Sequence, residues 1–154
     1  MQDFESGLRS FHHDIRKKMI SINELKVKYS GALAWSLGDN PAMADELADL
    51  IRKGFKTASC SSLMSYQSET PPLTVGSYGI ILNGAQEPVC VIRITSMYLI
   101  RFNEVTEEFA NKEGEGDLTL DYWRKEHKAF FTREGWFSEE MELVAEEFEL
   151  IEIF

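Results

Sequence analysis

The sequence predicts one α+β domain, in which a mostly antiparallel sheet is flanked by helices and can curl into a small barrel. The chain has 154 residues and an apolar fraction of 44%, which is enough for one hydrophobic core. Short extended runs joined by glycine-containing turns occupy the middle of the chain, and helical periodicities occur at its start and near its end. We divide the chain into an N-terminal helical segment, residues 1–30, packed on a domain formed by residues 31–154.

Two helices are expected in the first third of the chain. Near the N-terminus, apolar residues recur with helical spacing at Phe4, Leu8, Phe11 and Ile15. A second helix is expected in NPAMADELADLIRKG, where Asn40 can cap the first turn, Pro41 suits the first position and Gly54 suits a left-handed end. The buried face of this second helix should consist of Ala44, Leu47, Ala48 and Ile51. The helix therefore delivers Lys56 just beyond its C-terminus.

Four extended runs have the composition of β-strands. They are residues 57–64, residues 78–82, residues 89–98 and the C-terminal MELVAEEFELIEIF. Along the last run, apolar and acidic residues alternate, but the phase of the apolar residues shifts part of the way along. This shift predicts a long strand with a β-bulge near Glu146 or Glu147.

Two further helices are expected before the last strand. Asn103 can cap a short helix and Thr119 can cap a longer one. Between them lies KEGEGD, residues 112–117, whose two glycines are incompatible with a continuous helix. The apolar stripe of the longer helix consists of Leu120, Trp123, His127, Phe130 and Phe131. Because His127 follows the period of this stripe, we interpret it as a core residue.

The net charge of −10 argues against a protein that coats a nucleic-acid backbone, and no DNA partner is expected. The charge is uneven along the chain. Residues 1–56 carry 9 basic and 8 acidic side chains, a net of +1, whereas residues 57–154 carry 7 and 18, a net of −11. Any anion-binding face is therefore local, and we expect it in the N-terminal part.

The sequence gives no sign of a membrane span or of a structural metal. No apolar stretch approaches the roughly 20 residues that a span needs, and the N-terminus lacks the layout of a signal peptide. We therefore expect no membrane partner and a cytoplasmic protein. Cys60 and Cys90 have no C-x-x-C spacing and no histidine cluster beside them, so we expect reduced thiols and no zinc site.

The segment RKGFKTASCSS, residues 52–62, contains the first candidate for chemistry. Lys56 can be a solvated lysine at a helix end, or it can lie desolvated in a pocket and act as a base toward a neighbouring hydroxyl such as that of Ser59. Residues three apart in a regular strand point to opposite faces. The second alternative therefore requires a bend in the chain between Lys56 and Ser59.

The acidic loop and the tryptophans supply the remaining candidates. Glu113, Glu115 and Asp117 can form a solvated loop, or their glycine neighbours can let them converge on a ligand or a hydrated metal. Trp35, which lies beside the turn at Gly38, can be a core residue or can stack on a nucleobase.

The ordered set AWSLGDNPAMADELADLIRKGFKTASCS, VGSYGIIL, PVCVIRIT, FANKEGEGDLTLDYWRKEHKAFF and LVAEEFELIEIF resembles ASCH-domain proteins of the longer bacterial type. The resemblance covers Trp35 to Phe154. It implies a PUA-like fold, a small β-barrel of mostly antiparallel strands flanked by helices, with a cleft for RNA or modified nucleosides. The family signature G-x-K-x-x-[ST] matches Gly54, Lys56 and Ser59, with serine where threonine is commoner.

The resemblance also implies site residues. In a short branch of the family, a lysine, a threonine and a glutamate remove the acetyl group of N4-acetylcytidine. Those catalytic roles fall on Lys56, which takes the proton, Ser59, which attacks the carbonyl, and Glu113, which orients or protonates the leaving amine. The residues expected to bind the substrate are Trp35, Arg52, Lys53, Thr57, Tyr66, Glu115 and Asp117.

Several functional alternatives stay open at this point. The same cleft suits an RNA-cleaving enzyme, which is the one case in which a divalent metal is expected; otherwise we expect no cofactor. A non-catalytic RNA-binding module and a sensor of another small molecule are the remaining alternatives. The sequence leaves the oligomeric state open.

Overall fold

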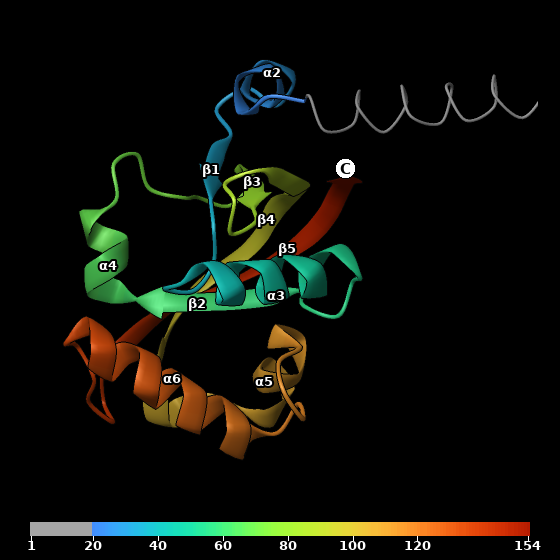
Figure 1. Cartoon of the computed structure of the whole chain (residues 1–154). Helices are drawn as coiled ribbons and strands as arrows, with labels where there is room; N and C mark the ends of the chain where they lie inside the picture. The colour runs from blue at the N-terminus through green and yellow to red at the C-terminus, as the bar shows by residue number, and fades with distance from the viewer. Residues whose placement is uncertain (1–19) are drawn as a thin grey trace, which may run out of the picture.

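The computed structural model describes residues 20–154, which form a curled five-stranded sheet with helices on both sides (Figure 1). The strands are β1 (Leu33–Trp35), β2 (Ala58–Ser62), β3 (Tyr78–Leu82), β4 (Pro88–Arg101) and β5 (Glu142–Ile153). Their order across the sheet is β1-β3-β4-β5-β2, and only the β1/β3 pair is parallel. The predicted α+β class with a mostly antiparallel sheet is confirmed, and the sheet forms a half-barrel with β1 and β2 at its edges.

Most of the predicted helices occur in this part of the chain. The helical segments are α2 (Ile22–Lys28), α3 (Pro41–Arg52), α4 (Leu63–Ser68), a 3-10 turn (Phe102–Glu104), α5 (Glu107–Glu113) and α6 (Leu120–Glu134). The helix expected around Phe4 to Ile15 lies outside the described residues. For α3 the prediction is confirmed: the Asn40 side chain accepts a hydrogen bond from the backbone N–H of Met43 at 2.8 Å, and Gly54 follows the helix with φ +83°. The predicted apolar face of α3 is buried.

The predicted start of α5 is wrong. Asn103 lies in the 3-10 turn, and Thr106 caps α5 by accepting a hydrogen bond from the N–H of Phe109. The cause is tertiary, because the backbone N–H groups of Phe102 and Asn103 donate to carbonyls in the loop before β5. The α-helix can begin only after this attachment. Thr119 caps α6, as predicted.

The bulge predicted near Glu146 or Glu147 of β5 lies instead in the neighbouring strand, β4. Ile94 pairs with Phe148 and Ser96 pairs with Glu147, so the extra residue lies in β4. The extra residue of β5 itself lies further along, between the partners of Val91 and Ile92. The first half of β5 lies between β4 and β2 and is buried on both faces. Because consecutive residues are buried there, apolar residues stop alternating with polar ones, and this change resembles the shift in phase that a bulge produces.

Three groups of buried side chains hold the layers together. One lies between the sheet and the pair α5 and α6, a second lies between the sheet and α3, and a third places Leu25 of α2 with Ile80 and Val91 of the sheet. Figure 1 shows α3 on one side of β2 and α6 on the other. Between residues 20 and 154, no helix has the length and apolar character needed to cross a membrane.

Candidate functional site

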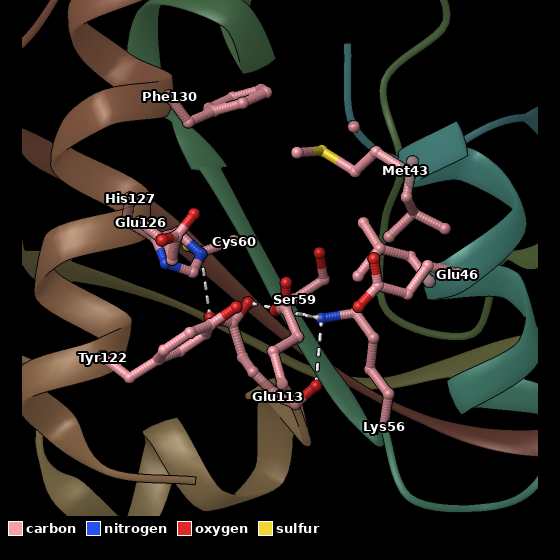
Figure 2. A pocket seen from close by; sticks show the side chains of 14 residues that line it. Met43, Glu46, Lys56, Ser59, Cys60, Glu113, Tyr122, Glu126, His127 and Phe130 are labelled. Carbon is pink, nitrogen blue, oxygen red and sulfur yellow. Dashed lines mark hydrogen bonds and ion pairs between the residues drawn. The ribbon is translucent and has the colours of Figure 1, made fainter. Parts of the chain in front are cut away.

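A cavity of about 160 Å³ lies beside the edge strand β2, between α3 and α6 (Figure 2). Met43 and Glu46 reach it from α3, and Tyr122 and His127 reach it from α6. Its remaining lining residues are Leu37, Gly38, Leu47, Lys56, Ser59, Cys60, Glu113, Glu115, Glu126 and Phe130. The cavity therefore gathers residues from four separate segments of the chain.

Lys56 and Ser59 both line this cavity, although they are three residues apart. Lys56 precedes β2, and its backbone N–H still donates to the carbonyl of Leu50 at the end of α3. The alternation of side-chain faces along a strand therefore does not apply to Lys56. The irregular entry into β2 supplies the bend that a shared pocket requires.

Lys56 is 2% exposed, so the interpretation as a solvated helix-end lysine is wrong. Its Nζ lies 3.1 Å from Oε2 of Glu115 and 3.6 Å from Oε1 of Glu113, and it donates to the backbone carbonyl of Glu113 at 3.3 Å. Burial by itself would lower the pKa of Lys56, but the charges of Glu113 and Glu115 raise it above its ordinary value. Lys56 is therefore held as a buried cation.

Glu113 is one of the two carboxylates that pair with Lys56, and it is 1% exposed. Its Oε2 accepts a hydrogen bond from the indole N–H of Trp123 and lies 3.0 Å from Nε2 of His127. Burial alone would raise the pKa of Glu113, but the charges of His127 and Lys56 lower it to about 2. A carboxylate with three partners of this kind stays ionised at neutral pH.

His127 is a site residue rather than only a core residue, which corrects the sequence-based interpretation. Its Nδ1 lies 2.8 Å from the carbonyl oxygen of Trp123, and its ring stacks on the indole with centroids 4.1 Å apart. Burial lowers the pKa of His127, but the adjacent charge of Glu113 raises it above its ordinary value. The helical period could not show this role, because Glu113 comes from another helix.

We expect the contribution of His127 to stability to depend on pH. A histidine whose pKa is raised on folding stabilises the protein below its unfolded pKa of about 6.5, and this stabilisation is lost as the pH rises through the folded pKa. The difference in unfolding free energy between wild type and His127→Gln should therefore be largest near about pH 6 and smaller near about pH 9. Urea denaturation at several pH values measures it, and a difference independent of pH would contradict the ion pair.

The turn at Gly114 brings Glu113 against Lys56. Gly114 ends α5 with φ +71°, and a Cβ at this position would overlap the backbone of Phe55. Beside it, the backbone N–H of Thr57 donates to the carbonyl of Lys112 at 2.8 Å. The end of α5 and the chain before β2 are therefore packed backbone against backbone, which fixes the ion pair from both sides.

Gly114→Ala should consequently destabilise the protein more than Gly135→Ala. Both glycines end a helix in the left-handed region, but a Cβ on Gly135 would meet no atom within 4 Å. The left-handed conformation costs an alanine about 1–2 kcal/mol in both variants, and overpacking should add about 1–3 kcal/mol at Gly114. Equal denaturation midpoints for the two variants would contradict the close approach.

The other residues expected to bind substrate lie in different places. Glu115 lines the cavity, and Trp35 lines a second cavity beside it. The hydroxyl of Tyr66 donates to the carbonyl of Leu73 at 2.6 Å, and its ring packs against the core group under α3. Tyr66 therefore lines neither cavity.

Four further residues lie on the surface, away from the cavity lining. Arg52 and Lys53 both pair with Asp49, at 2.7 Å in each case. The hydroxyl of Thr57 donates to the carbonyl of Lys112, and the carboxylate of Asp117 accepts from the backbone N–H of Thr119. These side chains serve the local structure of helix ends and loops.

The second cavity, of about 590 Å³, adjoins the first. The two share the lining residues Leu37, Gly38, Ser59, Cys60 and Phe130. Sequence reasoning missed Glu146 of β5, which lines the second cavity and is 8% exposed. The acidic alternation of the C-terminal strand gave no signal that would distinguish this glutamate from its neighbours.

Among the described residues, Cys60, Glu113 and His127 could offer ligands to a metal ion, since their ligand atoms lie within 4.8 Å of one another. Cys60 and Cys90 are both free thiols. Burial, and then the charge of Glu113, raise the pKa of the Cys60 thiol well above its ordinary value. The carboxylate of Glu113 is already bonded to Lys56, Trp123 and His127, so the arrangement fits a hydrogen-bonded network.

The half-barrel with flanking helices and an edge-strand cavity is a PUA-like fold. The sequence model of the ASCH domain matches residues 33–152, and the chain belongs to the ASCH domain family. ASCH domains are in general RNA-binding-type modules. No curated protein matches the chain significantly.

Solved structures agree with this family. The ASCH domain from Lactobacillus crispatus JV V101 is 37% identical, with a TM-score of 0.74, over 86% of this chain and 87% of that chain. A protein from Enterococcus faecalis V583 is 39% identical, with a TM-score of 0.71, over 78% of this chain and 76% of that chain. A mutant form of an ASCH protein from Zymomonas mobilis shares the fold at 12% identity, with a TM-score of 0.51, over 79% of this chain and 71% of that chain.

Proposed function

We propose that this protein is a hydrolase that removes an acyl group from the base of a modified nucleoside, as an N4-acetylcytidine amidohydrolase does. The observation that carries the proposal is the buried Lys56 cation beside the hydroxyl-bearing Ser59 in one small cavity. Amide hydrolysis needs a nucleophile together with a fixed positive charge where the carbonyl oxygen becomes an anion. The two residues supply these two requirements.

The charge states favour different roles from those that the resemblance implied. Lys56 is paired with two carboxylates and its pKa is raised, so it suits an oxyanion-stabilising cation better than a proton acceptor. Glu113, with a pKa of about 2, suits the fixed counter-charge that positions Lys56 better than a proton donor. Ser59 keeps the role of nucleophile.

The acidic lining favours a nucleoside over a long RNA. Besides Glu113, the first cavity is lined by the carboxylates of Glu46, Glu115 and Glu126. The second cavity is lined by the carboxylates of Glu69, Glu134 and Glu146. These side chains repel phosphate groups but can accept hydrogen bonds from the amino group of a base. Tyr122 and Phe130 also line the first cavity and provide aromatic faces for stacking.

The test is incubation of the purified protein with N4-acetylcytidine and, separately, with single-stranded RNA, each with and without Mg²⁺. Chromatography should show release of cytidine, and Ser59→Ala should abolish it. Absence of deacetylation would overturn the proposal. Cleavage of the RNA would favour a ribonuclease, and RNA binding that weakens with salt and survives Ser59→Ala would favour a non-catalytic module.

A further inference from the structure

We infer that Glu146 is a further catalytic residue, the general base that takes the proton of Ser59 during attack on the acyl group. The inference rests on the proposed function, because Ser59 is the nucleophile of that reaction. Lys56 is held as a cation and cannot take the Ser59 proton, so the reaction needs another proton acceptor, and we assign this role to Glu146. Three features of the structure support it: strand register, the shared cavity and the lack of a structural partner.

The strand register places the two side chains together. Ser59 of β2 is directly opposite Glu146 of β5 in the antiparallel pair. Residues directly opposite each other project to the same face of the sheet, with Cβ atoms about 4.5–5.5 Å apart. A glutamate side chain spans that separation and can place a carboxylate oxygen beside the serine hydroxyl.

Both side chains open onto the same space. Ser59 and Glu146 line the cavity of about 590 Å³, and Ser59 also lines the smaller cavity that contains Lys56. An acylated base bound at the junction would therefore meet Ser59, with the cation on one side and the glutamate on the other. General base, nucleophile and anion-stabilising charge would converge on one carbonyl group.

No structural partner explains why a carboxyl group is buried here. Within residues 20–154, the side chain of Glu146 has no hydrogen-bond or ion-pair partner, no buried side-chain oxygen lacks a partner, and Glu146 lines the larger cavity, so its carboxyl oxygens are accessible from that cavity; its β4 neighbour is Met97. Around it, Glu69, Glu134 and Lys26 line the same cavity, and Lys56 and Glu113 lie in the adjoining one. A mostly buried carboxyl group that no protein group binds and whose oxygens face the cavity is free to accept a proton from a group bound there.

The ionisation of Glu146 suits a base at neutral pH. Burial, and then the charge of Glu69, raise its pKa to about 7, although Lys56 acts in the opposite direction and Glu113 adds to the rise. A general base is most effective when its pKa lies near the working pH. Glu113, by contrast, is too weak a base for this step.

The proposed step is balanced. As the Ser59 Oγ forms a bond to the acyl carbon, its proton passes to a Glu146 oxygen and the carbonyl electron pair moves onto oxygen beside Lys56. When the C–N bond breaks, Glu146 gives that proton to the leaving nitrogen, which leaves an acyl-serine. Water then attacks the ester, Glu146 takes its proton, and the carboxylic acid leaves as Ser59 is reprotonated.

The experiment compares Glu146→Gln, which keeps the shape of the side chain, with the wild type and with Glu149→Gln, a change at an exposed position of the same strand. With N4-acetylcytidine, kcat/KM of Glu146→Gln should fall by about 10²–10⁴-fold, and the rise in rate with an apparent pKa near 7 should disappear. Glu149→Gln should keep both the rate and the profile.

A second readout does not depend on the nucleoside. A fluorophosphonate probe phosphonylates an activated serine, and intact-mass and peptide mass spectrometry give the rate at Ser59. This rate should fall in Glu146→Gln and stay unchanged in Glu149→Gln, with equal thermal unfolding showing that all variants are folded. If labelling of Ser59 depends on Glu146 but the nucleoside is not hydrolysed, Glu146 is still the base for Ser59, and N4-acetylcytidine is rejected as the substrate. Labelling that is equal in both variants, or absent at Ser59 in the wild type, would overturn the inference.

Discussion

Replacing Lys56 by methionine should destabilise the protein by about 3–5 kcal/mol and abolish hydrolysis. The variant removes the cation shared by Glu113 and Glu115 and leaves His127 as the remaining partner of Glu113, so the buried site keeps more negative charge than its partners compensate. Methionine has a similar length, so the loss of charge dominates over the loss of volume. Urea denaturation at pH 7 measures the difference in unfolding free energy.

A matched control separates burial from charge. Lys53 lies three residues earlier, its side chain is 50% exposed, and it pairs with Asp49 on the surface. Lys53→Met should change the unfolding free energy by less than about 1 kcal/mol. The double variant Lys56→Met/Glu113→Gln should regain part of the lost stability, because both charges are then removed. A Lys56→Met protein as stable as Lys53→Met would contradict the buried cation.

Ser59→Ala should lower kcat by at least about 10³-fold while leaving affinity for the nucleoside almost unchanged. Ser59 is half-buried at the edge of the sheet, so removing one hydroxyl should have little effect on stability. Kinetics give kcat, and calorimetric titration of the inactive variant gives the affinity. Ser68→Ala in α4, an exposed serine, is the control and should behave as the wild type. Wild-type turnover by Ser59→Ala would mean that water attacks the acyl group directly.

The sequence predicts those elements whose signals are local. In α3, the cap at Asn40, the proline after it and the glycine at the end all lie within the helix and its flanks, and the buried face follows one period. The start of α5 and the bulge depend on strands and loops far away in the chain, so Asn103 and Glu146 were misinterpreted. Propensity and period carry no information about such distant partners.

In the candidate site, too, the residues in the family motif could be predicted, whereas the partners that come from other elements could not. The family resemblance singled out Lys56, Ser59 and Glu113, and the structure brings all three to one cavity. It could not indicate that His127 of α6 would be the partner of Glu113, since the other members of the His127 stripe are apolar and the stripe therefore indicates a core face. Nor could it separate Glu146 from the other glutamates of the last strand, because only pairing with β2 sets that residue opposite Ser59.

Trapping the acyl-enzyme tests directly whether Ser59 is the nucleophile. The wild-type protein is mixed with N4-acetylcytidine, quenched with acid at early times and digested, and the peptides are analysed by mass spectrometry. The proposed mechanism predicts an acetyl group on Ser59 that appears before free acetate accumulates, and that is absent in Ser59→Ala and in Lys56→Met. Cytidine release without an acetyl group on Ser59, or acetylation of Lys56 or Cys60 instead, would contradict it.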